Sequence, residues 1–187
     1  MIEDEEAPAT LVLGLGNVLC CDDGVGIFAL EALRRRYAWP DDVALVDGGT
    51  LGLALLPMLE SAQSVWILDA VMADAPAGSL VALEGESVEP ALRDRLSPHQ
   101  IGVADLLDAL HWRDTWPERL RVLGLVPESL ELRIGLSPGV AAGLERLVEA
   151  AAAELAEAGH ELLPATEGSD ETTAHDDRGD AARALGL

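Results

Sequence analysis

The chain has 187 residues, which is enough for one domain with a substantial core and short for two. Apolar residues make up 49% of the sequence and aromatic residues only 3%, so alanine, leucine and valine are expected to form the core. The 34 acidic and 12 basic residues give a net charge of −22, which disfavours binding to nucleic acid or to anionic lipid.

The sequence carries no recognisable targeting signal. Its acidic start, MIEDEEAPAT, lacks the basic and apolar regions of a signal peptide, and no apolar run is long enough to span a membrane. Cys20 and Cys21 are the only cysteines, and they are adjacent, so no disulfide framework is expected. These features predict a cytoplasmic protein.

Composition divides the chain into three segments. Residues 1–9 are predicted to form an acidic N-terminal arm, and residues 10–163 have the patterning of one globular domain. Residues 164–187 contain few large apolar side chains, so they cannot bury enough surface to offset the entropy lost on ordering. They are predicted to be a disordered acidic C-terminal tail.

Strand and helix patterns alternate along the domain. Short apolar runs predict strands at 10–16, 43–49, 64–71, 79–86 and 119–127, the fourth as an edge strand. Helical spacing of apolar residues predicts helices at 24–39, 51–61 (interrupted by Pro57), 101–112 and 137–159. Ser137 is the expected N-cap of the last helix, with Pro138 at its first position. The alternation predicts an α/β fold with a largely parallel sheet and helices on both faces.

Acidic residues follow three of the predicted strands. Asp22 and Asp23 come after the first strand, Asp47 ends the second, and Asp69 ends the third. The carboxyl ends of parallel strands meet at one edge of the sheet, so these side chains are expected to gather there. Close carboxylates repel one another unless a cation or a shared proton compensates, and a metal site is the simplest explanation.

Each of these residues also has a purely structural interpretation. Asp22 or Asp23 is equally suited to cap the helix that begins near Gly24, and Asp47 before two glycines is typical of a turn. Asp69 is harder to explain structurally because it closes the apolar strand VWIL, where an unpaired carboxylate is costly. His99, in SPHQIG before a predicted helix, is by itself more typical of a loop. Imidazole and carboxylates together suit nickel or zinc.

Two other kinds of site are disfavoured by the first glycine-rich loop. Gly14-Leu15-Gly16 begins like a dinucleotide fingerprint, but position 19 is leucine, and two aspartates occupy the place where a pyrophosphate would bind. The same aspartates would raise the pKa of a thiol at Cys20 or Cys21, which argues against a cysteine nucleophile.

Five motifs in order give the chain a family resemblance. They are LGLGNVLCCDDGVG, VDGGTLG, ILDAV, SPHQIGVADLL and LGLVPESLELRIGLSP, and they span about residues 10–160. With this order and spacing the chain resembles the nickel–iron hydrogenase maturation endopeptidases. The resemblance implies a three-layer α/β/α sandwich with a twisted, mostly parallel sheet.

The resemblance also implies an activity and a set of site residues. Members of this family remove the C-terminal extension of a hydrogenase large-subunit precursor after nickel insertion. The metal-binding positions of the family correspond to Asp23, Asp69 and His99, and its acid after the second strand corresponds to Asp47, the expected catalytic residue. Asp23 stands where the family commonly has the longer glutamate. The implied nickel is that of the precursor, and other maturation factors are possible partners.

Two questions are left open by the sequence. The metal either marks a correctly loaded precursor or takes part in hydrolysis by polarising the scissile carbonyl or a water molecule; we favour recognition, with hydrolysis coupled to it. The alternative function is a nickel-binding chaperone of hydrogenase assembly that has no proteolytic activity, because the same ligands would serve both.

Overall fold

The computed structural model describes residues 8–85, 88 and 101–165. A five-stranded sheet with the order β3-β1-β4-β6-β5 forms its centre. The first four of these strands are parallel, and β5 is antiparallel to β6 at one edge. The strands are β1 (Thr10–Leu15), β3 (Val43–Gly49), β4 (Ser64–Ala70), β5 (Leu80–Glu84) and β6 (Arg119–Leu125). The predicted strands and the edge position of the fourth are confirmed.

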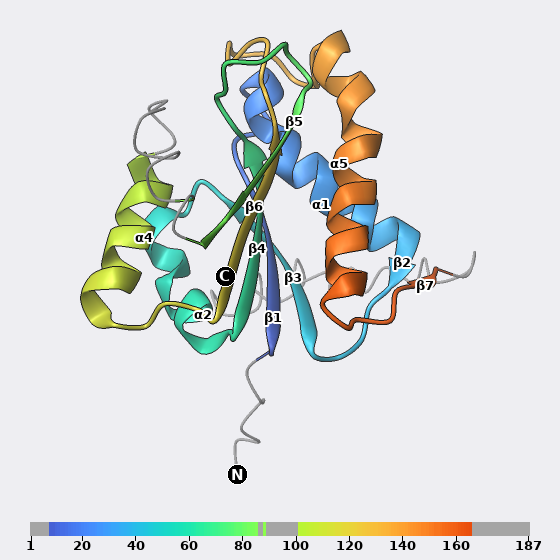
Figure 1. The fold of residues 1–187 in the computed structure, drawn as a ribbon. Helices are drawn as coiled ribbons and strands as arrows, with labels where there is room; N and C mark the ends of the chain where they lie inside the picture. The colour runs from blue at the N-terminus through green and yellow to red at the C-terminus, as the bar shows by residue number, and fades with distance from the viewer. Residues whose placement is uncertain (1–7, 86–87, 89–100, 166–187) are drawn as a thin grey trace, which may run out of the picture.

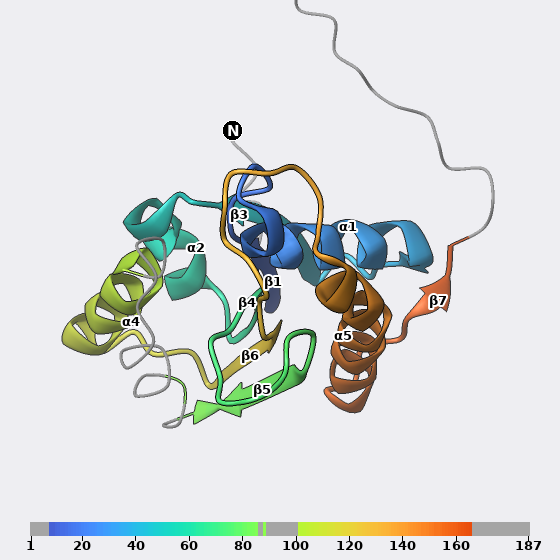
Figure 2. The ribbon, with the colours of Figure 1, turned by 90° about the horizontal axis from the view of Figure 1, so that it is seen from above.

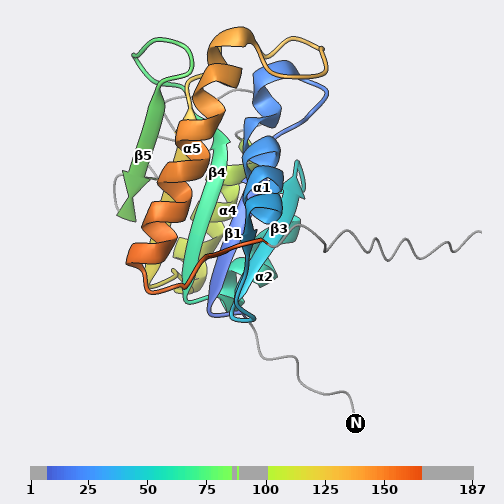
Figure 3. The same ribbon diagram turned by 90° about the vertical axis from the view of Figure 1, so that its right-hand side faces the viewer.

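Helices cover both faces of the sheet. Figure 1 shows the sheet edge-on, with α1 (Val25–Arg36) and α5 (Pro138–Glu157) on one side and α2 (Leu56–Ser61) and α4 (Ile101–Arg113) on the other. Figure 3, seen from the right, has α1 and α5 in front of the sheet and α4 behind it. The three-layer α/β/α sandwich is therefore confirmed.

The alternation of side chains along β1 supplies both halves of the core. Leu11 and Leu13 pack in the cluster that includes residues of α2 and α4, whereas Val12 packs in the cluster that includes residues of α1 and α5. All six residues of β1 are buried, as expected for a central strand of a parallel sheet covered on both faces.

Two predicted helices have different boundaries in the structure. The helix predicted at 24–39 ends at Arg36, because Tyr37–Ala38 form the short strand β2, which pairs antiparallel with β7 (Leu163–Pro164). The helix predicted at 51–61 begins as a 3₁₀ turn, η2 (Gly52–Leu55), and continues as α2. Pro57 lies at the start of α2, where its missing N–H leaves no helical hydrogen bond unmade.

The long C-terminal helix begins as predicted. Ser137 is the N-cap of α5, and its side chain accepts a hydrogen bond from the Val140 N–H at 3.5 Å. Among the residues that the structure describes, no helix is both long and apolar enough to cross a bilayer. Most of the predicted arm and tail, residues 1–7 and 166–187, lie outside the described residues, so those boundaries stay predictions.

Candidate active site

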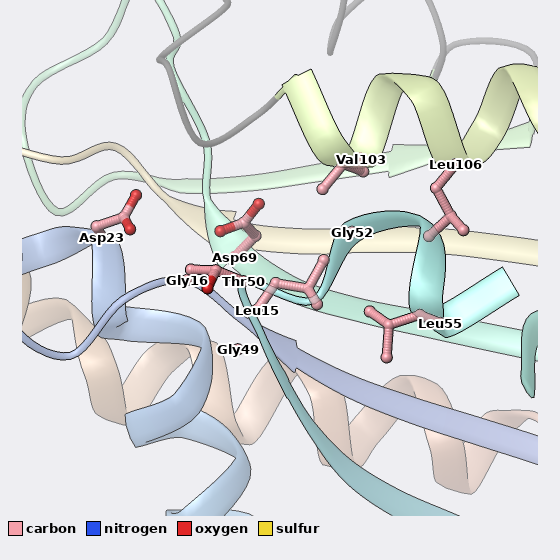
Figure 4. Close-up of a pocket in the computed structure, with 10 residues that line it drawn as sticks. All are labelled: Leu15, Gly16, Asp23, Gly49, Thr50, Gly52, Leu55, Asp69, Val103 and Leu106. Carbon is pink, nitrogen blue, oxygen red and sulfur yellow. The ribbon is translucent and has the colours of Figure 1, made fainter.

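A pocket opens at the carboxyl edge of the parallel strands, where the sequence places the aspartates. Figure 4 shows Asp23 and Asp69 in this pocket, on neighbouring elements and with both carboxylates directed to the same side. The loop after β3 forms another wall, and α4 closes the pocket with apolar side chains. The lining consists of Leu15, Gly16, Asp23, Gly49, Thr50, Gly52, Leu55, Asp69, Val103 and Leu106.

Asp69 at the end of β4 is a buried carboxyl group with little compensation. Its side chain is 5% exposed, and it accepts a hydrogen bond from the Ala70 N–H at 2.7 Å. Burial raises the pKa of Asp69 to about 7; the Ala70 hydrogen bond opposes this effect, and the negative charge of Asp23 adds to it. A cation bound here would supply the missing stabilisation of the carboxylate.

Asp23 belongs to η1 (Cys21–Gly24), the short 3₁₀ turn between β1 and α1. Its carboxylate is 3% exposed and accepts a hydrogen bond from the Asn17 N–H at 2.8 Å. Gly16 makes this tight turn possible: its φ is +113°, and a Cβ atom there would lie 1.7 Å from the carbonyl oxygen of Asp23. The glycine therefore lets the chain fold back and bring Asp23 to the pocket.

A second glycine brings the start of α1 against the sheet. A Cβ atom on Gly26 would lie 2.0 Å from the carbonyl oxygen of Leu68, the residue before Asp69 in β4. Because α1 packs this closely, η1 and the end of β4 come together, and Asp23 lies near Asp69. The glycines of this motif thus allow the close backbone packing that brings the two aspartates together.

Asp22 turns away from the pocket lining and binds a distant loop. Its carboxylate is 0% exposed and accepts hydrogen bonds from the backbone N–H groups of Glu128 (2.9 Å), Ser129 (2.9 Å) and Ser137 (2.6 Å). Burial raises the pKa of Asp22, but these hydrogen bonds outweigh it and hold the pKa below its usual value. Asp22 thus connects the loop before α1 to the loop before α5 and does not cap its own helix.

Asp47 and His99 stand differently from the two buried carboxylates. Asp47 is exposed at the end of β3, and its Oδ1 accepts a hydrogen bond from the Gly49 N–H at 3.0 Å, the turn interaction that its sequence suggested. It does not line the pocket, although Gly49 does. His99 lies outside the described residues; α4, which begins two residues later, contributes Val103 and Leu106 to the pocket.

Within the described residues, no three histidine, cysteine or acidic side chains meet as a metal site. The structure brings together Asp23 and Asp69, and the roles assigned to Asp23, Asp69, His99 and Asp47 stay predictions. Sequence reasoning did not select Thr50 or the α4 residues of the pocket. The segment GGTLG after a strand and the apolar face of the helix were the signals that could have indicated them.

The paired cysteines lie where the loop after β1 meets the loop before α5. Both are free, and Cys21 is buried, with its Sγ 2.9 Å from Nη2 of Arg133. Cys21 has a positive φ of 52° and donates its backbone N–H to the carbonyl oxygen of Arg133 at 2.7 Å. Its role in the described structure is to hold the loop that precedes α5.

Known proteins with the same pattern identify the family. The sequence pattern described as "Hydrogenase maturation protease" matches residues 27–154. The hydrogenase 2 maturation protease of Escherichia coli K12 is 42% identical over 156 residues, covering 82% of this chain and 94% of that protein. The chain belongs to the hydrogenase maturation protease family. It is therefore a peptidase.

Other relatives agree with this family assignment. The hydrogenase expression/formation protein HoxM of Azotobacter vinelandii is 35% identical over 153 residues, covering 76% of this chain and 74% of that one. The solved structure of the hydrogenase maturating endopeptidase HybD from Escherichia coli superimposes with a TM-score of 0.79 at 40% identity, covering 83% of this chain and 96% of that one. HybD from Thermococcus kodakarensis gives 0.65 at 28% identity, over 78% and 97% of the two chains.

Proposed function

We propose that this peptidase removes the C-terminal extension of a nickel–iron hydrogenase large-subunit precursor once nickel has been inserted. The nickel belongs to the precursor and serves as the signal that the substrate is loaded. Asp23 and Asp69, together with His99, bind it, and Asp47 acts in hydrolysis.

The observation that carries this proposal is the pair of buried carboxylates in one open pocket. Asp69 accepts a hydrogen bond only from its own neighbour within the described residues, and its pKa is raised to about 7. Asp23 is equally buried beside it. Among the residues that the structure describes, no cationic side chain pairs with either carboxylate, and a divalent ion on the substrate would provide positive charge. Carboxylate oxygens and one imidazole form an acceptable donor set for nickel.

The exposed position of Asp47 suits a role in proton transfer. Its Oδ1 is engaged by the Gly49 N–H, which orients the carboxylate at the loop that forms one wall of the pocket. We assign Oδ2 to accept the proton of the water that attacks the scissile carbonyl.

Cleavage of a loaded and an unloaded precursor tests the proposal. Nickel-loaded precursor is expected to lose its extension when it is incubated with the protein, and nickel-free precursor is expected to stay intact. The variants Asp23→Asn, Asp69→Asn and His99→Ala should lower the rate at least about a hundredfold, the usual cost of losing a group that positions the reaction. The released peptide is measured by mass spectrometry.

Controls separate the site from the fold. Asp41→Asn changes an exposed aspartate at the opposite edge of the sheet and should leave the rate unchanged. Asp47→Asn should abolish cleavage while binding to the loaded precursor persists. Equal cleavage of loaded and nickel-free precursor would contradict the role of nickel. Binding of loaded precursor with no cleavage by the wild-type protein would instead support the chaperone function.

A further inference from the structure

Two loops that are far apart in the sequence lie side by side at the pocket edge. The loop after β1 and the loop before α5 meet in an isolated parallel bridge between Cys20 and Arg133. The Arg133 N–H donates to the Leu19 carbonyl oxygen at 2.9 Å, and the Asp22 N–H donates to that of Ser129 at 3.1 Å. Seen from above in Figure 2, the loop before α5 runs next to the loop that leads into α1.

Apolar side chains project from this pair of loops into solvent. Leu132 is 84% exposed and Ile134 is 79% exposed, on either side of the exposed Arg133, whose guanidinium donates a hydrogen bond to the Sγ of Cys21. Leu19 on the facing loop is 50% exposed, next to Val18. We call Val18, Leu19, Leu132 and Ile134 the apolar platform.

The platform is held in place although it contributes little to the core. The three backbone N–H groups bound by the buried Asp22 carboxylate fix the loop that carries Leu132 and Ile134. Because these leucine and isoleucine side chains are exposed, they add little hydrophobic stabilisation to the folded monomer. A fixed loop that presents them outward is typical of an interaction surface.

The platform continues directly into the pocket. Gly16 and Asp23 both line the pocket, and the segment between them carries Val18 and Leu19. A polypeptide whose scissile bond lies over Asp23 and Asp69 therefore also reaches the platform. This continuity points to the substrate as the occupant.

The charge of the platform fits an apolar protein surface. Residues 17–21 and 129–135 contain two charged side chains, Glu131 and Arg133, which cancel, whereas the whole chain has a net charge of −22. These segments carry no net charge on an otherwise acidic molecule, and their exposed leucine and isoleucine side chains suit a protein interface.

We propose that the apolar platform is the docking surface for the hydrogenase precursor, and that it binds an apolar area of the precursor next to its C-terminal extension. This inference rests on the proposed function for the identity of the occupant. The carboxylate pocket recognises the metal, and the platform supplies contact area that is independent of the metal.

The double variant Leu132→Ser/Ile134→Ser tests the docking surface. Both side chains are exposed, so the fold and the urea midpoint should be preserved. For nickel-loaded precursor, KM is expected to rise about tenfold or more while kcat changes less than about twofold, because interface centres made of a few side chains carry most of the binding energy. The dissociation constant for the precursor, measured by biolayer interferometry, should weaken by the same factor.

Matched control variants show whether weaker precursor binding comes from the loss of apolar contact or from a disturbed fold. Leu132→Met/Ile134→Val keeps the apolar character and should behave as wild type. Trp112→Ser removes an 89% exposed apolar side chain at the far end of α4 and should change neither KM nor the dissociation constant.

The outcomes separate this inference from the proposed function. Equal precursor binding by the wild type and the double serine variant would overturn the platform, whether or not cleavage occurs. Weakened binding by the double serine variant, with no cleavage by the wild type, would refute the proposed removal of the C-terminal extension and keep the docking surface. A wild-type dimer that the serine variant loses in sedimentation, with precursor binding unchanged, would assign the platform to a second copy of this chain and overturn the inference.

Discussion

Asp69 lies in an environment far from that of an ordinary, solvated aspartate. Its carboxyl group is buried at the end of a strand, and its pKa is about 7 in the folded protein against 3.8 for the free side chain. The unfolded chain therefore loses this proton at a lower pH than the folded chain does. The contribution of Asp69 to stability is least unfavourable below pH 3.8 and worsens as the pH rises towards 7.

Replacing Asp69 with asparagine should therefore stabilise the metal-free protein, and more so at higher pH. We compare the free energies of unfolding of Asp69→Asn and of the wild type. Their difference should increase in favour of the variant by roughly 2–3 kcal/mol as the pH rises from 5 to 8, as expected for a carboxyl group with these two pKa values. Urea unfolding in the presence of a chelator measures it. A constant difference across this pH range would show that Asp69 is ionised in the folded protein.

The sequence allowed some of these residues to be understood and not others. Asp69 was identifiable because an apolar strand, VWIL, runs into it, which makes its burial predictable. The hydrogen bonds of Asp22 could not be predicted, because its partners Glu128, Ser129 and Ser137 are more than a hundred residues away in the sequence. A carboxylate at the start of a helix predicts a local cap. The strand order, in which β4 lies between β1 and β6, brings the loops after β1 and β6 together and gives Asp22 distant partners instead.

At the scale of elements, the carboxylate of Asp22 holds together two loops that follow strands of the sheet. The loop between β1 and α1 and the loop between β6 and α5 are joined through Asp22 and through backbone hydrogen bonds at Cys21 and Arg133. The N-terminal end of α5 depends on this contact, because the N–H of its cap residue Ser137 donates to Asp22. A change at Asp22 should thus affect α5 as well as its own loop.

We expect Asp22→Ala to lower the free energy of unfolding by about 3 kcal/mol, because three backbone N–H groups, that of Ser137 buried, lose a charged acceptor. Urea unfolding measures the total effect, and hydrogen exchange at Glu128 and Ser129 measures the local one. Asp22→Asn keeps one oxygen acceptor, so its free energy of unfolding should lie between those of the wild type and Asp22→Ala. Asp74→Ala, at an exposed aspartate, is the control; a similar loss there, or none at Asp22, would contradict this account.

Element boundaries followed local sequence only where tertiary contacts agreed with it. The spacing of apolar residues predicts a helix over 24–39, yet Tyr37 and Ala38 are not helical and pair with Leu163 and Pro164. That pairing depends on a segment at the other end of the domain. By contrast, β3 matches its predicted range of 43–49, because the Gly pair that ends it is a local signal.

At the scale of the whole molecule, negative charge dominates. A net charge of −22 on 187 residues repels itself most in the compact state, and salt screens this repulsion. The sequence alone predicted the layers and the strand order along the chain, because strands and helices alternate regularly. It could not predict which exposed apolar side chains share one surface, since that depends on loops brought together by the fold.

Raising NaCl from about 50 to about 500 mM at pH 7.5 should increase the free energy of unfolding by about 1 kcal/mol, because the Debye length falls well below the size of the domain. Urea midpoints at each salt concentration measure the effect. The same comparison near pH 4.2, the isoelectric point expected from the sequence, is the control and should give little change. A decrease with salt at pH 7.5 would show that attractive pairs outweigh the repulsion.

The bond between Asp22 and Ser137 also has a consequence for biosynthesis. The two residues are 115 positions apart, so a chain emerging from the ribosome displays both adjacent aspartates long before the loop that fixes them has been made. Until Ser137 is outside the exit tunnel, the turn that carries Asp23 lacks its anchor. A nascent fragment therefore holds an unassembled site, and proteolytic competence arrives only when translation of the domain is nearly finished.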